Sequence, residues 1–398
     1  MTKLNKYTYI DLFAGCGGLS LGLFKSGWKG LFAIEKNEMA FETLKHNLID
    51  KKNHFDWPSW LPRKAHDINN ILIEYENELL KLRGKVTLIA GGPPCQGFSI
   101  AGRRNENDER NKLVDAYIKF VGLVRPRIIF FENVRGFTAR FKKKDSPGKI
   151  YSDYIQEKLK QLGYNVPAKI VNFGEYGIPQ NRRRFILVGL LDGDAGSFFK
   201  EIVDKKIEFL KNKRLNEKVT LKEAISDLER KNGEIKSRDF NNFNEGIYKK
   251  PGSNYQKLLR EGYDGEFPDS HRFPNHKKET MVRFREIIKK CPKGKNLNKN
   301  LKQEFNLNKH CITPLDSSDR SVTLTTLPDD CLHYSEPRIL TVREYARIQS
   351  FDDWYEFKKN YTTGGSQRKI DVPRYTQVGN AIPPLFMEYA GGILKGMA

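Results

Sequence analysis

Short apolar runs and amphipathic segments alternate along the first part of the chain. The apolar runs predict strands at 7–13, 31–35, 86–90 and 127–132. Segments with helical periodicity predict helices at 19–25, 39–48 and 113–124. Uninterrupted apolar runs are typical of strands that are buried on both faces, as in parallel sheets covered by helices. The pattern therefore predicts an α/β fold with a doubly wound, mostly parallel sheet, which binds ligands at the carboxyl ends of its strands.

This alternation breaks off at two places. The segment 51–62, with its two Trp and two Pro residues, is interpreted as a surface excursion. After Leu191 the pattern is lost, and the stretch from His271 to His310 holds 12 lysines and arginines against 3 glutamates, a net charge of +9. We therefore expect a first domain at 1–191, a smaller, irregular and basic domain at 192–334, and a return segment at 335–398 that completes the first domain.

The charge of the whole chain indicates a polyanionic partner. Its 398 residues carry a net charge of +21, with a pI near 9.5, so DNA, RNA and acidic membrane surfaces all qualify on charge alone. No apolar stretch approaches the roughly 20 residues of a membrane span. The N-terminal residues lack the apolar core of a signal peptide. We therefore expect a cytoplasmic protein.

The cysteines do not indicate a metal site or a disulfide framework. Their number is odd, and no CxxC pair occurs among Cys16, Cys95, Cys291, Cys311 and Cys331. A zinc site or a set of disulfides would require paired spacings. Reduced thiols and no bound metal are expected.

A glycine-rich turn at 11–18 follows the first strand and opens a helix. Glycine tolerates positive φ and allows close approach of a ligand, and a helix N-terminus offers N–H groups to an anion. Glu35 ends the next strand, where an acidic residue commonly binds ribose hydroxyls. The glycines depart from the GxGxxG spacing of dinucleotide sites, so a nucleotide site and an ordinary tight turn both remain open.

Cys95 lies in Gly91-Gly92-Pro93-Pro94-Cys95-Gln96-Gly97-Phe98-Ser99, directly after the strand at 86–90. A thiolate presented by such a loop is a strong nucleophile, although a lone cysteine is more often a buried structural thiol. Glu132 follows the strand at 127–132 and is expected at the same sheet edge, as an acid or as a solvated carboxylate. Arg182 and Arg184 alternate, which predicts one shared strand face. Three neighbouring arginines also suit a phosphate-contacting or solvated surface.

Taken together, Asp11-Leu12-Phe13-Ala14-Gly15-Cys16-Gly17-Gly18, the Cys95 segment, Phe131-Glu132-Asn133-Val134 and Gln180-Asn181-Arg182-Arg183-Arg184 resemble the motifs of the DNA (cytosine-5) methyltransferase family, in that family's order. The resemblance spans about 11–190 and 335–391 and is closest to the bacterial restriction–modification type. It implies methyl transfer from S-adenosylmethionine to carbon 5 of a cytosine that is flipped out of double-stranded DNA. Cys95 would add to carbon 6, Glu132 would contact N3 and the exocyclic amine, and Arg182 and Arg184 would lie near the active site, Arg184 on the carbonyl oxygen.

The resemblance also implies the cofactor site. Phe13 and the glycines would line the methionine end, Glu35 would hold the ribose, and Asp67 and Ile68 would contact adenine. Lys36 departs from the family, which often places an aromatic or apolar residue against the adenine ring. The cofactor-binding residues implied in this way are Asp11, Phe13, Gly15, Gly17, Gly18, Leu19, Glu35, Asp67, Ile68, Pro94, Leu113 and Asn380.

Later segments complete the resemblance. The basic region 192–334 occupies the place of a target-recognition domain, and 321–326 resembles the threonine-rich turn that closes it. Thr341 and Glu344 predict a capping box at the start of a helix. The segment 377–384 matches the last motif, whose helix is expected to pack beside the first motif. The polar segment 96–112 is expected to close over DNA as a lid.

Other functions remain open on the sequence. An RNA cytosine-5 methyltransferase would share most of these motifs, but Gly97-Phe98-Ser99 and the large basic insert favour duplex DNA. A non-catalytic DNA-binding protein would not require Cys95, Glu132 and Arg184. A nicotinamide-dependent dehydrogenase would require the missing glycine spacing. We expect a monomer that protects host DNA from a cognate restriction endonuclease, although a solitary regulatory methylase would have the same sequence features.

Overall fold

The computed structural model describes residues 7–94, 112–140, 150–363, 367 and 370–398. Cys95 and residues 96–111 of the predicted lid lie outside the described residues. The chain forms two compact units. Unit 1 comprises Met1–Asn172, Arg183–Lys206 and Phe386–Ala398, and unit 2 comprises Phe173–Arg182 and Ile207–Leu385.

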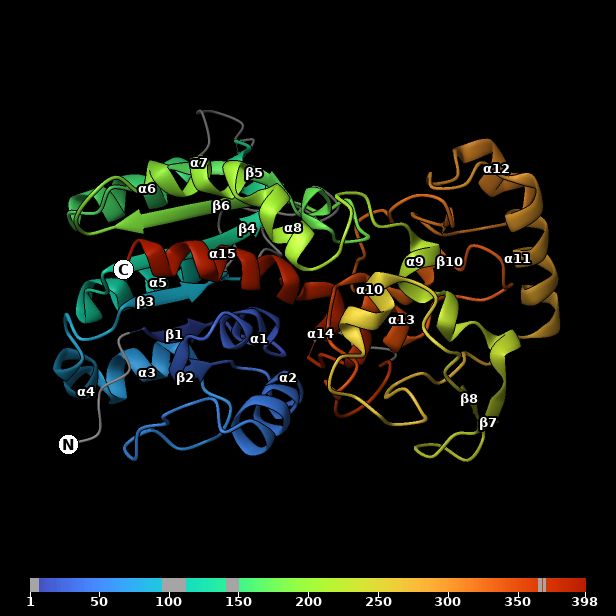
Figure 1. Ribbon diagram of the computed structural model, residues 1–398, viewed down its shortest axis with the longest axis horizontal. Coiled ribbons are helices and arrows are strands. Elements are labelled where there is room, and N and C mark those ends of the chain that lie inside the picture. The colour runs from blue at the N-terminus through green and yellow to red at the C-terminus, as the bar shows by residue number, and fades with distance from the viewer. Residues whose placement is uncertain (1–6, 95–111, 141–149, 364–366, 368–369) are drawn as a thin grey trace. The chain divides into compact units, whose positions relative to one another are not determined.

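Unit 1 is built on a six-stranded sheet in the order β2-β1-β3-β4-β6-β5 (Figure 1). All pairings are parallel except the two made by β6, which runs antiparallel to β4 and β5. The strands are β1 (Thr8–Leu12), β2 (Lys29–Ile34), β3 (Leu88–Gly91), β4 (Ile128–Val134), β5 (Ala168–Asn172) and β6 (Arg183–Leu190). The predicted mostly parallel sheet is confirmed.

Helices follow the strands as the sequence pattern predicts. Predicted helix 19–25 is α1, 113–124 is α5, and 39–48 continues from α2 into a π-helical segment at Lys45–Lys51. The central strands β1, β3 and β4 are almost wholly buried, which explains their uninterrupted apolar runs. The helices of unit 1 are α1 (Gly18–Lys25), α2 (Glu38–Leu44), α3 (Ile68–Glu74), α4 (Glu76–Lys81), α5 (Lys112–Val124), α6 (Tyr151–Gln161), α7 (Gly196–Asp204) and most of α15 (Pro384–Gly396).

The segment 51–62 is not the surface excursion that its prolines suggest, and that prediction is wrong. Phe55 is 3% exposed and forms a parallel bridge with Gly30 at the edge of β2. Trp57 is 8% exposed and packs edge-on against Phe32 and Phe41. Burial of large aromatic side chains outweighs the local turn signals here, so the segment covers the sheet edge.

The end of the chain packs beside α1. The Trp28 indole Nε1 donates to the carbonyl oxygen of Gly391 in α15 over 2.9 Å. A Cβ at Gly391 would lie 2.4 Å from Ser26 Oγ, so only glycine allows this close approach. The return to unit 1 begins at Phe386, because residues 335–385 belong to unit 2.

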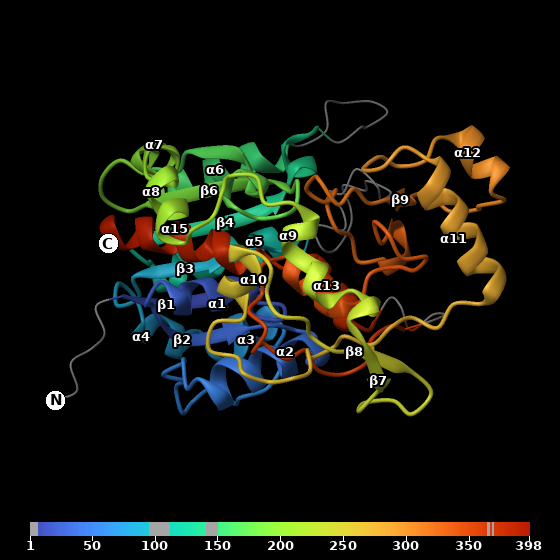
Figure 2. The same ribbon diagram turned by 45° about the vertical axis from the view of Figure 1, so that its right-hand side comes forward.

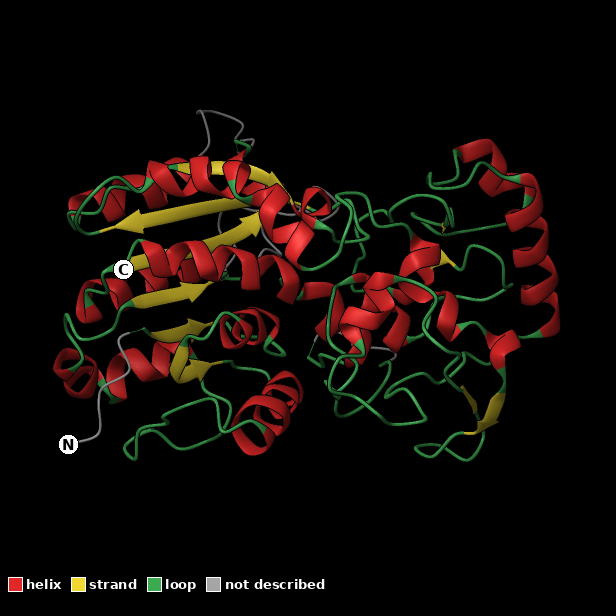
Figure 3. Cartoon of the chain, viewed as in Figure 1, coloured by secondary structure: helices red, strands yellow, loops and turns green. Residues whose placement is uncertain are grey.

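Unit 2 consists mainly of loops and short helices, with small two-stranded pairings (Figures 2 and 3). The predicted capping box of Thr341 and Glu344 is confirmed at the start of α13. Elements here are α8 (Lys206–Asn212), which begins in unit 1, α9 (Leu221–Ile225), β7 (Glu234–Lys236), β8 (Asn244–Gly246), α10 (Asn254–Leu259), α11 (Lys278–Lys290), α12 (Lys299–Glu304), β9 (Thr313–Pro314), β10 (Cys331–Leu332), α13 (Val342–Ile348) and α14 (Arg374–Asn380).

A buried ionic network explains why residues 335–385 stay with unit 2. Arg347 in α13 is fully buried and forms ion pairs with Asp227 at 3.0 Å and Asp353 at 2.5 Å. Its Nη1 also donates to the carbonyl oxygen of Ala224 in α9. Removing one partner of such a buried set would leave an uncompensated charge. The functional roles expected for 1–191, 192–334 and 335–398 stay predictions.

Candidate active site

The glycine-rich turn after β1 is held open by its backbone geometry. Phe13, Gly15 and Gly17 all have positive φ, at 60°, 56° and 89°. Phe13 is not a glycine, so this conformation carries strain that the surrounding structure must hold in place. A Cβ built on Gly15 would meet no atom within 4 Å. The turn therefore offers a cradle in which a ligand can approach the backbone closely.

Glu35, at the end of β2, anchors this turn. Its Oε2 accepts the N–H of Gly15 at 2.8 Å, and its Oε1 accepts the N–H of Asn37 at 2.7 Å. Burial raises the pKa of Glu35, while the N–H donors act in the opposite direction. The backbone N–H of Lys36 is a third donor to this carboxylate, so one of its roughly four lone-pair positions stays open. A partly buried carboxylate with an open acceptor position suits a hydroxyl group of a ribose.

Asp11 lies below the turn and faces α1. It is 1% exposed, and its Oδ2 accepts the Ser20 hydroxyl at 2.6 Å. Burial raises the pKa of Asp11 from 3.8 to about 7, with Ser20 lowering it and Glu35 raising it. Asp11 thus ties β1 to the start of α1, and its predicted part in cofactor binding stays a prediction.

This shift predicts a pH-dependent stability. Because the fold favours the neutral carboxyl, the stability that Asp11 contributes is full below its ordinary pKa of 3.8 and falls as the pH rises through about 7. Asp11→Asn removes the titration, so the melting temperature of the variant relative to wild type is expected to be higher at pH 8 than at pH 5. Thermal melts at intervals from pH 5 to pH 8.5 measure this difference. A constant difference across the range would contradict the prediction.

The start of α3 is tied to the end of β2. The His66 N–H donates to the Glu35 carbonyl oxygen at 2.8 Å, and Lys36 Nζ lies 2.8 Å from Asp67 Oδ2. Asp67 also caps α3 through its Oδ1. Burial acts to raise the pKa of Asp67, but Lys36 and the Asn69 N–H outweigh it and hold that pKa below its usual value. Ile68 is 3% exposed. Three predicted cofactor residues, Glu35, Asp67 and Ile68, therefore lie in neighbouring segments.

Glu132 and Arg184 meet at the carboxyl end of β4. Arg184 Nε lies 2.9 Å from Glu132 Oε1, and the two side chains are 11% and 14% exposed. Arg184 Nη1 also donates to the carbonyl oxygen of Arg183. A guanidinium has five N–H donors, so three remain without a partner among the described residues. They can donate to a substrate oxygen beside the carboxylate.

The chain that leads to Cys95 runs against Glu132. A Cβ on Gly92 would lie 2.7 Å from the Glu132 carbonyl oxygen and 3.0 Å from its Oε2. The Asn133 amide donates to the carbonyl oxygen of Pro93 at 3.1 Å. Gly92 is thus required by the close approach of two segments, which sequence reasoning did not identify. Pro94, one residue before Cys95, is the last residue that the structure describes before Lys112.

Arg182 directly precedes β6, which begins at Arg183. Arg182 and Arg184 are buried whereas Arg183 is exposed, and that the two share one strand face stays a prediction. Arg182 is 2% exposed in unit 2, where its Nη2 donates to Gly379 O at 2.9 Å and its Nη1 to Leu324 O at 3.2 Å. Buried polar groups are normally hydrogen-bonded, and here the acceptors are backbone carbonyl oxygens of two other segments. Arg182 therefore joins the 321–326 turn to α14, and its catalytic role stays a prediction.

The other predicted cofactor residues are scattered over both units. Gly17, Gly18 and Leu19 are buried at the start of α1. Pro94 is exposed after β3, and Leu113 is half-buried at the start of α5. Asn380 is exposed at the end of α14 in unit 2.

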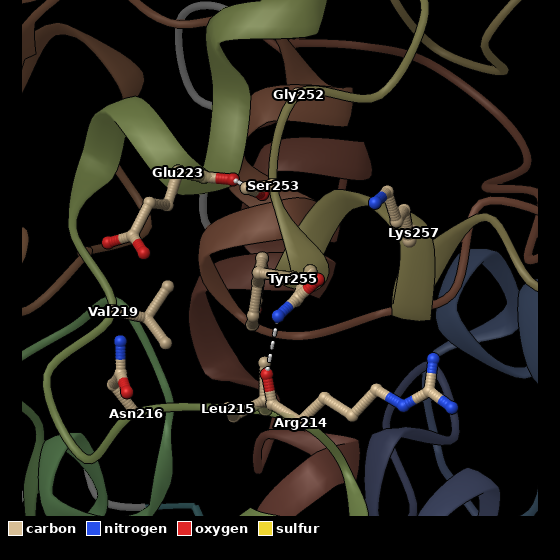
Figure 4. Close-up of a pocket in the computed structure, with 10 residues that line it drawn as sticks. Arg214, Leu215, Asn216, Val219, Glu223, Gly252, Ser253, Tyr255 and Lys257 are labelled. Carbon is tan, nitrogen blue, oxygen red and sulfur yellow. Dashed lines mark hydrogen bonds between the residues drawn. The ribbon is translucent and has the colours of Figure 1, made fainter.

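A pocket of about 280 Å³ lies in unit 2 (Figure 4). Figure 4 draws residues that line it, among them Arg214, Tyr255 and Lys257. The Asn254 amide donates to the Arg214 carbonyl oxygen at 3.0 Å. No residue proposed from the sequence lines it. Its lining is Arg214, Leu215, Asn216, Val219, Glu223, Gly252, Ser253, Asn254, Tyr255 and Lys257. The pocket therefore does not bear on the predicted cofactor site.

The described residues contain neither a membrane-spanning helix nor a metal site. Within them, no helix is long and apolar enough to cross a membrane. Over the same part of the chain, no group of His, Cys, Asp or Glu side chains is arranged to hold a metal ion. Burial raises the pKa of the Cys16 thiol to about 12, which leaves it unreactive.

Comparison with known proteins identifies the family. The model of the C-5 cytosine-specific DNA methylase family matches residues 7–395. The type II methyltransferase M.DdeI of Desulfomicrobium norvegicum is 29% identical, covering 95% of this chain and 86% of that protein. The type II methyltransferase M.XorII of Xanthomonas oryzae pv. oryzae is 28% identical, covering 98% and 84%.

Solved structures share the fold. A structure described as a prophage-encoded DNA modification methyltransferase from E. coli has a TM-score of 0.66 at 22% identity, covering 98% of this chain and 99% of that one. The S. pombe Dnmt2 methyltransferase has a TM-score of 0.55 at 15% identity, covering 98% and 99%. With the family match over nearly the whole sequence, the chain belongs to the C-5 cytosine-specific DNA methylases and is a DNA (cytosine-5-)-methyltransferase.

Proposed function

We propose that the chain methylates carbon 5 of a flipped-out cytosine within a specific double-stranded DNA sequence, through a covalent bond between Cys95 and carbon 6. The observation that carries this proposal is the pair of Glu132 and Arg184 at the carboxyl end of β4, 2.9 Å apart. The segment that leads to Cys95 passes directly against Glu132 at Gly92. An acid and an oxygen-binding cation thus lie beside the described residues that precede the proposed nucleophile in the sequence.

The turn after β1, the end of β2 and the start of α3 fit S-adenosylmethionine, which supplies an electrophilic methyl group when bound. Gly15 leaves open space over the backbone, and Glu35 keeps an acceptor position for a ribose hydroxyl group. The Asp67 carboxylate can accept a hydrogen bond from the exocyclic amine of adenine. Phe13, Gly17, Gly18 and the remaining residues implied by the family would complete the site.

The reaction needs a nucleophile because carbon 5 of cytosine is itself a poor one. The Cys95 thiolate forms a bond to carbon 6, and the electrons of the 5,6 double bond become available at carbon 5. Glu132 donates a hydrogen bond or proton at N3, which offsets the charge that builds on the ring. The three N–H groups of Arg184 that have no partner within the described part of the chain suit the carbonyl oxygen of the base. After carbon 5 is methylated, a base removes its proton, the double bond re-forms and the thiolate leaves.

A base inside a stacked duplex cannot reach these groups. Methyltransferases that act on a base extrude it from the helix into a pocket, at a cost of a few kcal/mol for unpairing and unstacking. The proposed substrate is therefore duplex DNA with a flipped cytosine. The type II methyltransferases to which the chain is similar support a role in protecting host DNA from a cognate restriction endonuclease.

The basic face of α11 supports DNA contact by the region 192–334. Lys278, Arg285 and Lys289 are exposed on one helix face and have no ion-pair partner among the described residues. By contrast, Lys290 on the neighbouring face pairs with Glu286 at 2.7 Å. Unpaired cations on a helix suit the phosphate backbone, whose contacts give affinity without sequence information.

This face leads to a measurable prediction. Changing Lys278, Arg285 and Lys289 together to Gln is expected to weaken DNA binding and to reduce the slope of log K against log salt by about 0.9 for each phosphate that is no longer neutralised. The methylated sequence is expected to stay the same. A control of equal charge changes Lys81, Lys85 and Arg127, which are exposed and precede β3 and β4, away from the carboxyl ends of these strands; of the three, Lys81 is paired with Glu78 at 2.7 Å. Equal slopes for both triple variants would exclude this face as a DNA contact.

Trapping with 5-fluorocytosine tests the proposed reaction. Fluorine at carbon 5 cannot leave as a proton does, so the bond between enzyme and base is expected to persist when S-adenosylmethionine is present. The expected result is a covalent complex with duplex DNA that maps to Cys95 by mass spectrometry. An adduct that forms with RNA and not with DNA would mean that RNA is the substrate. No adduct with either would refute the covalent mechanism.

A further inference from the structure

Lys36 bridges the end of β2 and the start of α3. It directly follows Glu35, and its Nζ lies 2.8 Å from Asp67 Oδ2. The Lys36 side chain is nevertheless 79% exposed, whereas that of Asp67 is 22% exposed. Its methylene stem thus crosses from one segment to the other without entering the core. An apolar stem with a fixed charged end is available to cover the surface of a bound group.

The hydrogen bonds of Asp67 leave one acceptor position open. Its Oδ1 accepts the N–H of Asn69 at 2.9 Å and the amide Nδ2 of the same residue at 3.0 Å. Its Oδ2 receives Lys36. An ionised carboxylate has about four lone-pair positions, two on each oxygen. The remaining position therefore lies on the oxygen that Lys36 holds in place.

We propose that Lys36 positions the purine ring of the cofactor, by orienting Asp67 Oδ2 toward the exocyclic amine and by covering one ring face with its stem. The inference rests on the proposed cofactor site, in which Glu35 holds the ribose. A ring that continues past Glu35 reaches the segment where Lys36 and Asp67 meet, because the His66 N–H fixes that segment to the Glu35 carbonyl oxygen. Lys36 takes the place of the aromatic or apolar residue that the family often has against the ring.

Because Lys36 is exposed, a role in cofactor binding can be distinguished from a role in folding. A solvent-exposed ion pair contributes little to folding, so variants at Lys36 are expected to melt at the wild-type temperature. Lys36→Met keeps an apolar stem and removes the charge, whereas Lys36→Ala removes both. Lys36→Arg retains a cation that can hold Asp67. Lys64→Met is the matched control, since Lys64 is exposed in the same part of the chain and its only described hydrogen bond is made by its backbone N–H.

Calorimetric binding of two ligands to the purified full-length enzyme tests the proposal. One ligand is S-adenosylhomocysteine, and the other is its inosine counterpart, in which oxygen replaces the exocyclic amine. Lys36→Met is expected to weaken S-adenosylhomocysteine by about two- to tenfold, the range of one hydrogen bond, and to leave the inosine counterpart unchanged. Lys36→Ala is expected to weaken both ligands. Lys36→Arg is expected to restore the preference for the amine.

Other outcomes overturn the inference in distinguishable ways. Wild-type affinities in Lys36→Met, or an equal loss for both ligands, would mean that Lys36 does not position Asp67 for the amine. Tighter S-adenosylhomocysteine binding in Lys36→Met would mean that Lys36 competes with the ring. If the wild-type enzyme bound neither ligand, the proposed cofactor site itself would fail, and the inference with it.

Discussion

Replacing Cys95 with serine is expected to lower kcat by about 10,000-fold or more, the scale on which removal of a catalytic nucleophile acts. A serine hydroxyl is ionised far less readily than a thiol. The proposed mechanism includes no general base that would activate this hydroxyl. Single-turnover methylation of duplex DNA, with and without the substitution, measures the loss. The trapped complex with 5-fluorocytosine DNA is expected to disappear in the same variant.

DNA affinity separates a chemical defect from a folding defect in this experiment. Cys95→Ser is expected to bind duplex DNA with wild-type affinity, since the basic residues of the chain are unchanged. Cys311→Ser is the control, because Cys311 is a partly exposed thiol of unit 2, whose pKa is raised by burial. It is expected to retain full activity. Full activity of Cys95→Ser would refute the covalent mechanism, whatever the behaviour of the control.

The sheet and its helices could be predicted because their signals are local. The runs that form β1, β3 and β4 are apolar throughout, since these strands are covered on both faces. The burial of segment 51–62 could not be predicted, because its prolines are local turn signals, whereas the positions of Phe55 and Trp57 depend on the distant strand β2. A single sequence does not show which edge of a sheet such aromatic side chains will cover.

The site was predictable where one motif supplies both the residue and its position. Glu35 directly follows β2 and Glu132 lies in the last residues of β4, two parallel strands, so their common edge follows from the strand pattern alone. The pairs that complete the site join distant motifs. Lys36 meets Asp67, which is 31 positions later in the sequence, and Glu132 meets Gly92 because two strands run side by side. The start of β6 at Arg183, between Arg182 and Arg184, is likewise not revealed by three consecutive arginines.

Glu132→Gln is expected to reduce kcat by about 100- to 10,000-fold, the usual contribution of general acid–base catalysis. The amide matches the carboxylate in shape and can still accept a hydrogen bond from Arg184 Nε, which lies 2.9 Å away in the wild type. It cannot transfer a proton to N3, so the ring has less help when the thiolate adds to carbon 6. Wild-type affinity for duplex DNA and for S-adenosylhomocysteine would show that the loss falls on the chemical step.

Exchange of the carbon 5 hydrogen of cytosine with solvent shows which step is lost. Exchange requires addition at carbon 6 and does not require methyl transfer, so it reports the step that Glu132 is proposed to assist. We expect exchange and methylation to fall together in Glu132→Gln. If exchange were unchanged while methylation slowed, Glu132 would instead act in a step that follows the addition of the thiolate to carbon 6. Glu132→Ala adds a second effect, because the Arg184 guanidinium then loses the partner that orients it. The excess loss in Glu132→Ala over Glu132→Gln therefore measures how far the ion pair itself positions Arg184 for the carbonyl oxygen of the base.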